Sequence, residues 1–166
     1  MISWRALTCA DIPDVVEIAA IAHPDYPEEA WVIANRLGLF EAGCMLAERD
    51  ETAAGYMLSH PWRRGNPVAL NYEIDGIPAD ADCLYIHDLA LTPESRGTGA
   101  AQLAVSCAAD IAGAHGFEHL AIVALPGAIP FWRRQGFEPH ALDSADLERK
   151  YGRGALYMER RIPSDS

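Results

Sequence analysis

The sequence has no long hydrophobic run, few cysteines and little positive charge, and each of these absences excludes a class of protein. No apolar stretch approaches the roughly 20 residues that a membrane-spanning helix needs, and the N-terminal residues lack the layout of a signal peptide. The four cysteines are scattered, without a C-x-x-C pair or the Cys/His spacing of a zinc site. We therefore expect reduced thiols in a cytoplasmic protein, and no metal.

The charge balance limits the partners. Acidic residues outnumber basic ones by 24 to 13, and the formal net charge is -11. Such a surface repels nucleic acid and anionic membranes, so neither is an expected partner, whereas a cationic amine is a suitable ligand. The length of 166 residues predicts one domain, residues 1–166, with a hydrophobic core of its own.

The chain is organised around residues 84–115. Residues 84–91 form an apolar run that predicts a buried strand, and residues 92–95 a turn. From Ala100, small and apolar side chains recur at the spacing of one helix face, and Gly116 marks the end of that helix. Strands are also expected over 2–7, 43–49, 53–60, 119–125, 137–142 and 155–161, helices over 12–22, 28–39 and 128–135, and a long loop over 61–82.

The segment between this strand and this helix predicts an anion site. The first N–H groups of a helix have no partner within it, and the helix dipole favours negative charge there. Gly97 and Gly99 allow a sharp turn and close approach of a phosphate, and Arg96 adds a positive charge. We therefore interpret the loop as a pyrophosphate site.

Three kinds of phosphate loop have to be distinguished here. A P-loop needs a Lys-Ser/Thr pair after its last glycine, and none is present. The dinucleotide fingerprint would end at Gln102, where a small residue belongs, and Glu118 precedes the next expected strand instead of following it. The third pattern, R/Q-x-x-G-x-G/A, fits Arg96-Gly97-Thr98-Gly99-Ala100-Ala101 in full.

A second motif lies about 35 residues further on. Residues 131–137, Phe-Trp-Arg-Arg-Gln-Gly-Phe, match an F-Y-x-x-x-G-F segment, with Ala128 three residues before it. With both motifs in this order, the chain resembles the GNAT superfamily, the Gcn5-related N-acetyltransferases. The resemblance implies an α/β (α+β) fold with a mixed, mostly antiparallel, twisted sheet of about six or seven strands and about four helices, splayed between the fourth and fifth strands.

The resemblance implies acetyl-CoA as cosubstrate, with no metal. Its pantetheine arm would lie along the central strand, where a backbone N–H polarises the thioester carbonyl. The implied contacts are Leu89, Ala90 and Leu91 for the arm, Arg96, Gly97, Thr98, Gly99, Ala100 and Ala101 for the pyrophosphate, and Phe131 and Trp132 from the second motif.

Acetyl transfer to an amine needs a base, because only about one alkylamine in a thousand is neutral at pH 7. His87 is the first candidate, since arylalkylamine acetyltransferases in the superfamily have histidine at the matching place; a core histidine is the alternative. Asp88 is expected on the opposite face by strand alternation, as base, orienting group or structural residue. Tyr85 shares the face of His87, as part of a water relay or as a half-buried aromatic.

Trp132 departs from the family pattern. It replaces the tyrosine that often protonates the leaving thiolate, and an indole cannot give up its proton as a phenol can. Either no such acid is used, or Tyr85 or a water replaces it. The departure is also compatible with a GNAT-like module that binds acetyl-CoA without catalysis, for sensing or for a structural role.

The acceptor site is expected around the second helix and the long loop, where aromatic faces can bind a cation. Its candidates are Tyr26, Trp31, Trp62 and Tyr72, each of which also fits an ordinary structural position. The resulting hypothesis is an N-acetyltransferase that acts on a primary amine of a small molecule or peptide, by direct attack in a ternary complex. A homodimer is a further expectation, since dimers are common in the family.

Overall fold

The computed structural model describes residues 1–25, 27–70, 72–142 and 144–163, and it has one seven-stranded sheet in the order β1-β2-β3-β4-β5-β7-β6. The strands are β1 (Ile2–Ala6), β2 (Cys44–Arg49), β3 (Thr52–Trp62), β4 (Cys83–Leu91), β5 (His119–Ala124), β6 (Glu138–Pro139) and β7 (Leu156–Arg161). The β4–β5 pair is parallel, and the other five pairs are antiparallel. The expected mixed, mostly antiparallel sheet is confirmed.

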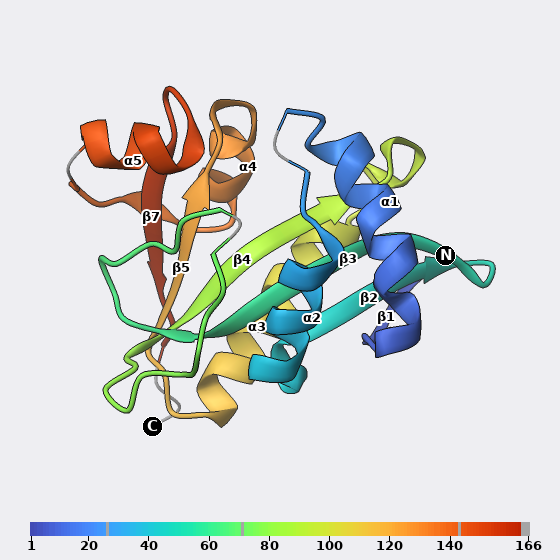
Figure 1. Ribbon diagram of the computed structural model, residues 1–166, viewed down its shortest axis with the longest axis horizontal. Coiled ribbons are helices and arrows are strands. Elements are labelled where there is room, and N and C mark those ends of the chain that lie inside the picture. Colours follow the sequence, from blue (N-terminus) through green and yellow to red (C-terminus); the bar gives the residue numbers. More distant parts are fainter. Residues whose placement is uncertain (26, 71, 143, 164–166) are drawn as a thin grey trace.

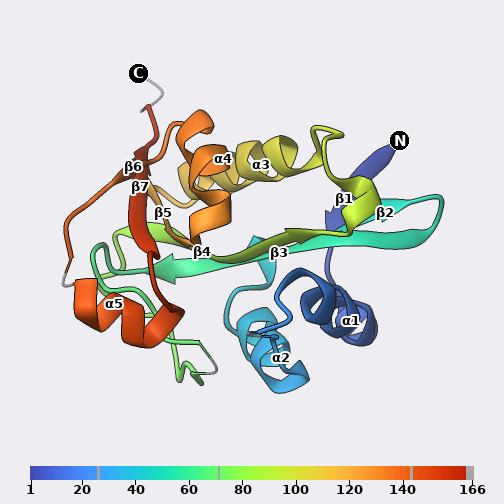
Figure 2. The ribbon, with the colours of Figure 1, turned by 90° about the horizontal axis from the view of Figure 1, so that it is seen from above.

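Helices cover both faces of the sheet. They are α1 (Ile12–Ala22), α2 (Ala30–Leu39), α3 (Ala100–Ala114), α4 (Ile129–Arg134) and α5 (Ser144–Tyr151). Figure 2 shows α3 and α4 on one face and α1, α2 and α5 on the other. This arrangement leaves the centre of the sheet, β3 and β4, covered on both sides, as an apolar central run requires.

The core packs by matching small side chains of α3 to larger ones of the sheet. Ala104 and Ala108 are fully buried against Leu84 and Leu120. On the other face, α1 and α2 bury a second cluster that includes Ile33 of α2. The helical spacing seen in the sequence therefore corresponds to real burial on both faces.

Most elements lie where the sequence predicts them, with two differences near the C-terminus. The predicted strand 137–142 shortens to the two residues of β6. No element is predicted over residues 143–154, and these include the fifth helix, α5. That helix is mostly polar, and it is held by burial of Leu147 and Tyr151 against the sheet.

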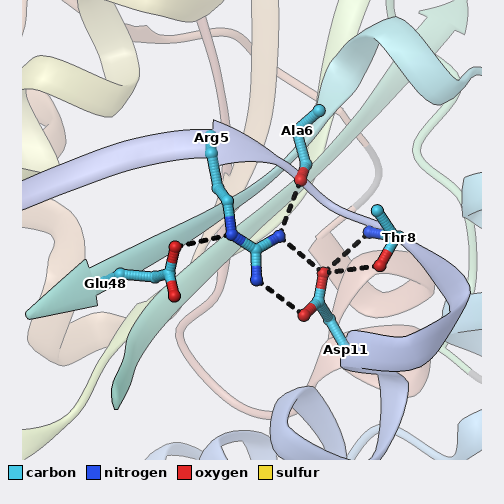
Figure 3. A network of polar contacts seen from close by, with 5 residues as sticks. All are labelled: Arg5, Ala6, Thr8, Asp11 and Glu48. Carbon is cyan, nitrogen blue, oxygen red and sulfur yellow. Dashed lines mark hydrogen bonds and ion pairs between the residues drawn. The ribbon is translucent and has the colours of Figure 1, made fainter. Parts of the chain in front are cut away.

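A polar network fastens the first strand to its neighbours, as Figure 3 shows. The Arg5 guanidinium donates to both carboxylate oxygens of Asp11, at 2.8 Å each, and to Glu48 on β2 at 2.6 Å. Asp11 also accepts from the backbone N–H of Thr8, so a capping box joins these two residues. The guanidinium lowers the pKa of the Asp11 carboxyl, because its hydrogen bonds favour the anion.

β4 carries a bulge that the sequence does not reveal. Leu58 of β3 pairs with Asp88 and Ser59 pairs with Ile86, which leaves His87 as an extra residue. Alternation is therefore interrupted, and both His87 and Asp88 make side-chain hydrogen bonds on the side of α1 and α2. The expectation that Asp88 points away from His87 is wrong, because a bulge shifts the phase of the strand by one residue.

Candidate functional site

The site is built where β4 and β5 separate. The two strands pair only at Leu84 with Leu120 and at Tyr85 with Ala121, and beyond these residues they diverge (Figure 1). The predicted splay is thus confirmed. A cavity of about 110 Å³ occupies this region, lined by His23, Glu28, Leu70, Ile86, His87, Asp88, Leu89, Ile122, Val123, Leu125, Ala128, Trp132 and Tyr151.

The cavity reaches both faces of the sheet. Ile86 and Leu89 belong to the core beneath α3 and α4, whereas His87 and Asp88 bond to residues on the α1 and α2 side. All four line the same space. A ligand entering from the α3 side can therefore meet one entering from the α1 side within the gap between the strands.

His87 is paired with a glutamate that the sequence analysis did not single out. His87 Nε2 lies 2.8 Å from Glu28 Oε1, and the two side chains are 1% and 5% exposed. Glu28 belongs to the segment just before α2, so an element 59 positions away supplies the partner. An ionised carboxylate accepts the Nε2 proton, which leaves Nδ1 as the free basic nitrogen of the ring.

Asp88 is held by two donors. His23, at the C-terminal end of α1, lies 3.0 Å from one carboxylate oxygen, and the Tyr56 hydroxyl donates to the other. Burial raises the pKa of Asp88, but these partners outweigh it and the net shift is downward. The hydrogen bond to Asp88 in turn raises the pKa of His23 against its partial burial. Asp88 is therefore a stabilised anion and a weak base.

Tyr85 does not line the cavity. Its hydroxyl is fully buried and lies 3.0 Å from that of Tyr151, and burial raises its pKa to about 12. Tyr151, from α5, does line the cavity, as does Trp132. The tyrosine that lines the cavity thus comes from α5, and Tyr85 contacts its hydroxyl from β4.

The glycine loop has the geometry expected of an anion site. Gly97 and Gly99 have φ angles of 75° and 86°, a left-handed conformation that side chains disfavour. Gly99 is the N-cap of α3, so the N–H groups of the next three residues have no partner within the helix. Arg96, Gly97, Thr98 and Gly99 are all exposed. The loop thus presents an exposed turn with unpaired backbone N–H groups, which is the arrangement that an anion site requires.

The other predicted ligand contacts fall into two groups. Leu89 and Trp132 line the cavity, and Ala90, Leu91 and Phe131 are buried or half-buried near it on β4 and α4. Of the acceptor candidates, Trp31 and Tyr72 are 43% and 54% exposed, and Trp62 bonds through its indole to Asn66. None of these three lines the cavity, and Tyr26 lies outside the described residues.

Apart from apolar side chains of β4 and of residues 122–125, sequence reasoning missed His23, Glu28, Leu70 and Tyr151 of the cavity wall. They come from three separate segments, and no shared motif links them to the central strand. The proline-rich break after His23 was the one local signal, because an irregular segment between helices commonly lies over a site.

Within the described ranges of the chain, no helix is both long and apolar enough to cross a membrane. This agrees with the lack of long apolar runs in the sequence.

Comparison with solved structures identifies the fold. Ard1 from Thermoplasma volcanium superposes with a TM-score of 0.76 at 14% identity, over 98% of this chain and 99% of that one. The ribosomal-protein-S18-alanine N-acetyltransferase from Escherichia coli gives 0.71 at 16% identity, over 100% and 97%. N-acetylglutamate synthase from Neisseria gonorrhoeae, complexed with coenzyme A and N-acetyl-glutamate, gives 0.75 at 18% identity, over 98% of this chain and 35% of that one.

At such identities these likenesses establish the fold alone. No curated protein sequence matches the chain. The model of the acetyltransferase (GNAT) family, however, matches residues 9–137, which include the glycine loop, the central strand and the Phe131–Phe137 motif. The chain therefore belongs to the GNAT acetyltransferase family.

Proposed function

We propose that the protein transfers an acetyl group from acetyl-CoA to a primary amine of a small molecule or peptide, by direct attack in a ternary complex. The observation that supports this most is the buried His87–Glu28 pair on the wall of a cavity that opens through the gap between β4 and β5. The reaction requires a base at the place where the amine and the thioester meet, and this cavity joins the two faces of the sheet.

Bound acetyl-CoA supplies the activated acetyl group. Arg96 and the first-turn amides of α3 would hold its diphosphate, since the left-handed Gly97 and Gly99 bring the backbone into reach. The edge of β4 over residues 89–91 has no partner strand on the β5 side and is available to its pantetheine arm. A solved structure with the same fold contains coenzyme A, which supports this class of cosubstrate.

The acceptor amine would enter from the α1 and α2 side. Two carboxylates, Glu28 and Asp88, line that end of the cavity and favour an ammonium group over an anion. His87 then takes the proton from the amine, with Glu28 stabilising the resulting imidazolium. Asp88 is not the base, because its hydrogen bonds with His23 and Tyr56 stabilise the carboxylate and make it a poor proton acceptor.

Trp132 supports a second candidate function. Its indole lines the cavity at the position of the family tyrosine and has no acidic proton to give to a thiolate. A weakly active or inactive module that binds acetyl-CoA is consistent with that substitution. The acetyl-transfer proposal instead requires a water, or the Tyr151 hydroxyl, to protonate the thiolate.

The deciding experiment is a screen of amines with acetyl-CoA, followed by detection of free thiol. Turnover is expected with at least one primary amine of a small molecule or of a peptide N-terminus. Tight acetyl-CoA binding without release of thiol from any amine would reject the transferase proposal in favour of the binding module.

Calorimetric titration of acetyl-CoA tests the phosphate site separately. Arg96→Ala is expected to weaken binding by about tenfold, the loss of one charge-assisted contact. Arg63→Ala is the matched control and should leave affinity unchanged, because Arg63 follows the end of β3 that pairs with the start of β4, whereas Arg96 follows the end of β4. Equal affinities for the wild type and Arg96→Ala would remove the diphosphate role of this loop arginine.

A further inference from the structure

Four residues hold all the buried side-chain nitrogen and oxygen atoms that have no hydrogen-bond partner within the described part of the chain. These atoms are Glu28 Oε2, Arg36 Nε, Arg36 Nη2, His60 Nε2 and His87 Nδ1. The residues come from four places: the segment before α2, α2 itself, β3 and β4. Unpaired buried polar atoms are rare and costly, so their concentration in one group of residues calls for a physical explanation.

The four residues belong to one region of the fold. His87 bonds to Glu28, and His60 lies on the neighbouring strand β3, where its partner Tyr85 is two residues before His87. The charge of Arg36, on α2, contributes to the lowered pKa of His60, and Glu28 acts on Arg36 in turn, so its guanidinium lies in the neighbourhood of both. Glu28 and His87 also line the cavity, so solvent in the cavity reaches the cluster.

Arg36 is the unusual member, because it is a fully buried cation. Its side chain is 0% exposed, and it makes no ion pair with any carboxylate in the described ranges. The one hydrogen bond of its guanidinium goes to the side chain of Asn35. That amide also donates to the carbonyl oxygen of Ile74, in the long loop, and accepts from its backbone N–H. Burial lowers the pKa of Arg36, and the nearby charge of Glu28 opposes that shift.

The donors and acceptors of the cluster are complementary. His60 Nδ1 lies 3.0 Å from the Pro61 carbonyl oxygen and must donate to it, so Nε2 is a free acceptor. Burial keeps this ring neutral by lowering its pKa to about 3. His87 Nδ1 and Glu28 Oε2 are acceptors as well, and Arg36 offers two N–H donors. A water that accepts from Arg36 and donates to two of the acceptors would satisfy both sides.

We propose that Arg36 is a positioning residue for the His87–Glu28 pair, and that it acts through one or two buried waters that it shares with Glu28, His60 and His87. Such waters fix the open nitrogen of His87 as an acceptor and connect it to the cavity. The catalytic part of this inference rests on the proposed acetyl transfer, but the shared hydration does not.

The test compares Arg36→Met with Arg36→Lys, using Arg49→Met as the control. Buried waters are located in a crystal structure of each variant, and kcat and KM are measured with any amine that turns over. Arg36→Met is expected to lose the shared waters and to lower kcat by about tenfold, with KM for acetyl-CoA unchanged, because the open nitrogen of His87 is then no longer fixed as an acceptor. Arg36→Lys should restore most of the activity, because its ammonium group still donates to a water.

A crystal structure of the wild type supplies an independent readout. One or two waters are expected within about 3.2 Å of both Arg36 and an acceptor of the cluster. A direct Arg36–Glu28 ion pair without water, or waters that stay in place in Arg36→Met, would overturn the proposal. If Arg36→Met does not fold, His60→Gln replaces it, and waters at unchanged positions in that variant would count against the cluster. If no amine turns over, acetyl transfer fails, while the positions of the waters still decide this inference.

Discussion

His87 lies at the bulge where β4 gains one residue over β3, and its side chain reaches Glu28 beside α2. Without the bulge, regular alternation would send Asp88 to the opposite face from His87. With it, the base candidate and a stabilised carboxylate share one side of the sheet. A single inserted residue therefore sets which chemical groups meet in the cavity.

The His87 imidazole is the proposed base. His87→Ala should therefore lower kcat for acetyl transfer by about 10² to 10⁴-fold, because the amine then has no positioned proton acceptor. Acetyl-CoA affinity should stay unchanged, since the imidazole is not part of the phosphate loop. Steady-state kinetics and calorimetry measure the two quantities. His140→Ala, at an exposed position, is the control, and full activity of His87→Ala across pH would reject the role of this histidine.

At the scale of elements, the turn before α3 and the network around β1 both depend on specific backbone and charge geometry. Gly99 ends the loop in a left-handed conformation, and the Arg5–Asp11–Glu48 network links β1 to η1 (Cys9–Asp11) and β2. Each makes a separable prediction, one about ligand binding and one about stability.

Gly99→Ala should weaken acetyl-CoA binding about tenfold, because a left-handed residue with a Cβ costs roughly 1–2 kcal/mol and the loop relaxes away from the phosphate-binding geometry. Isothermal titration gives the dissociation constant. Gly113→Ala, within α3, has open space at its Cβ and an ordinary helical backbone, so it serves as the control. Unchanged affinity in Gly99→Ala would show that the loop geometry does not matter for the ligand.

The ion pair at Asp11 makes the stability depend on pH. Its folded-state pKa lies below the ordinary value, so its contribution is present above about pH 4 and is lost as the pH falls through the folded-state pKa. Asp11→Asn should cost about 1–2 kcal/mol at pH 7, less than a buried pair because Arg5 is 40% exposed. Urea unfolding at several pH values measures this cost.

The difference between wild type and Asp11→Asn should narrow steadily below pH 4. Asp80→Asn is the control, because its partner Arg63 is on an open surface and the loss should not be measurable. A penalty at Asp11 that stays constant down to the acid transition would mean that the charge is not its source.

At the scale of the whole molecule, the two halves of the sheet pair with each other only at one end of β4 and β5, among the described residues. A ligand that touches the α3 loop, the β4 edge and α4 would link the two halves of the sheet. Acetyl-CoA at 100 times its dissociation constant should therefore stabilise the fold by about 2.7 kcal/mol.

This corresponds to a rise in Tm of roughly 5–10 °C for a chain of this length. Differential scanning fluorimetry with acetyl-CoA measures it. Arg96→Ala should show a smaller rise at the same concentration, and a wild-type Tm that does not respond to millimolar acetyl-CoA would argue against binding in the gap.

The sequence by itself determined the order of the elements, the glycine loop and the family. These rest on local rules: helical spacing sets α3, left-handed geometry favours Gly97 and Gly99, and the motif at 131–137 recurs at a fixed place in the fold. The polar helix α5 escaped prediction because its two buried contacts, Leu147 and Tyr151, are too few to give a periodic pattern.

Only the tertiary structure decided the composition of the site. Glu28, which bonds to His87, is 59 positions away in the sequence, and the buried atoms without a partner on Arg36 and His60 come from two further elements, α2 and β3. No local pattern encodes this grouping, because it follows from how α2 packs on β3 and β4. The bulge at His87 is likewise a matter of pairing with β3, so a reading of β4 alone assigns Asp88 to the wrong face.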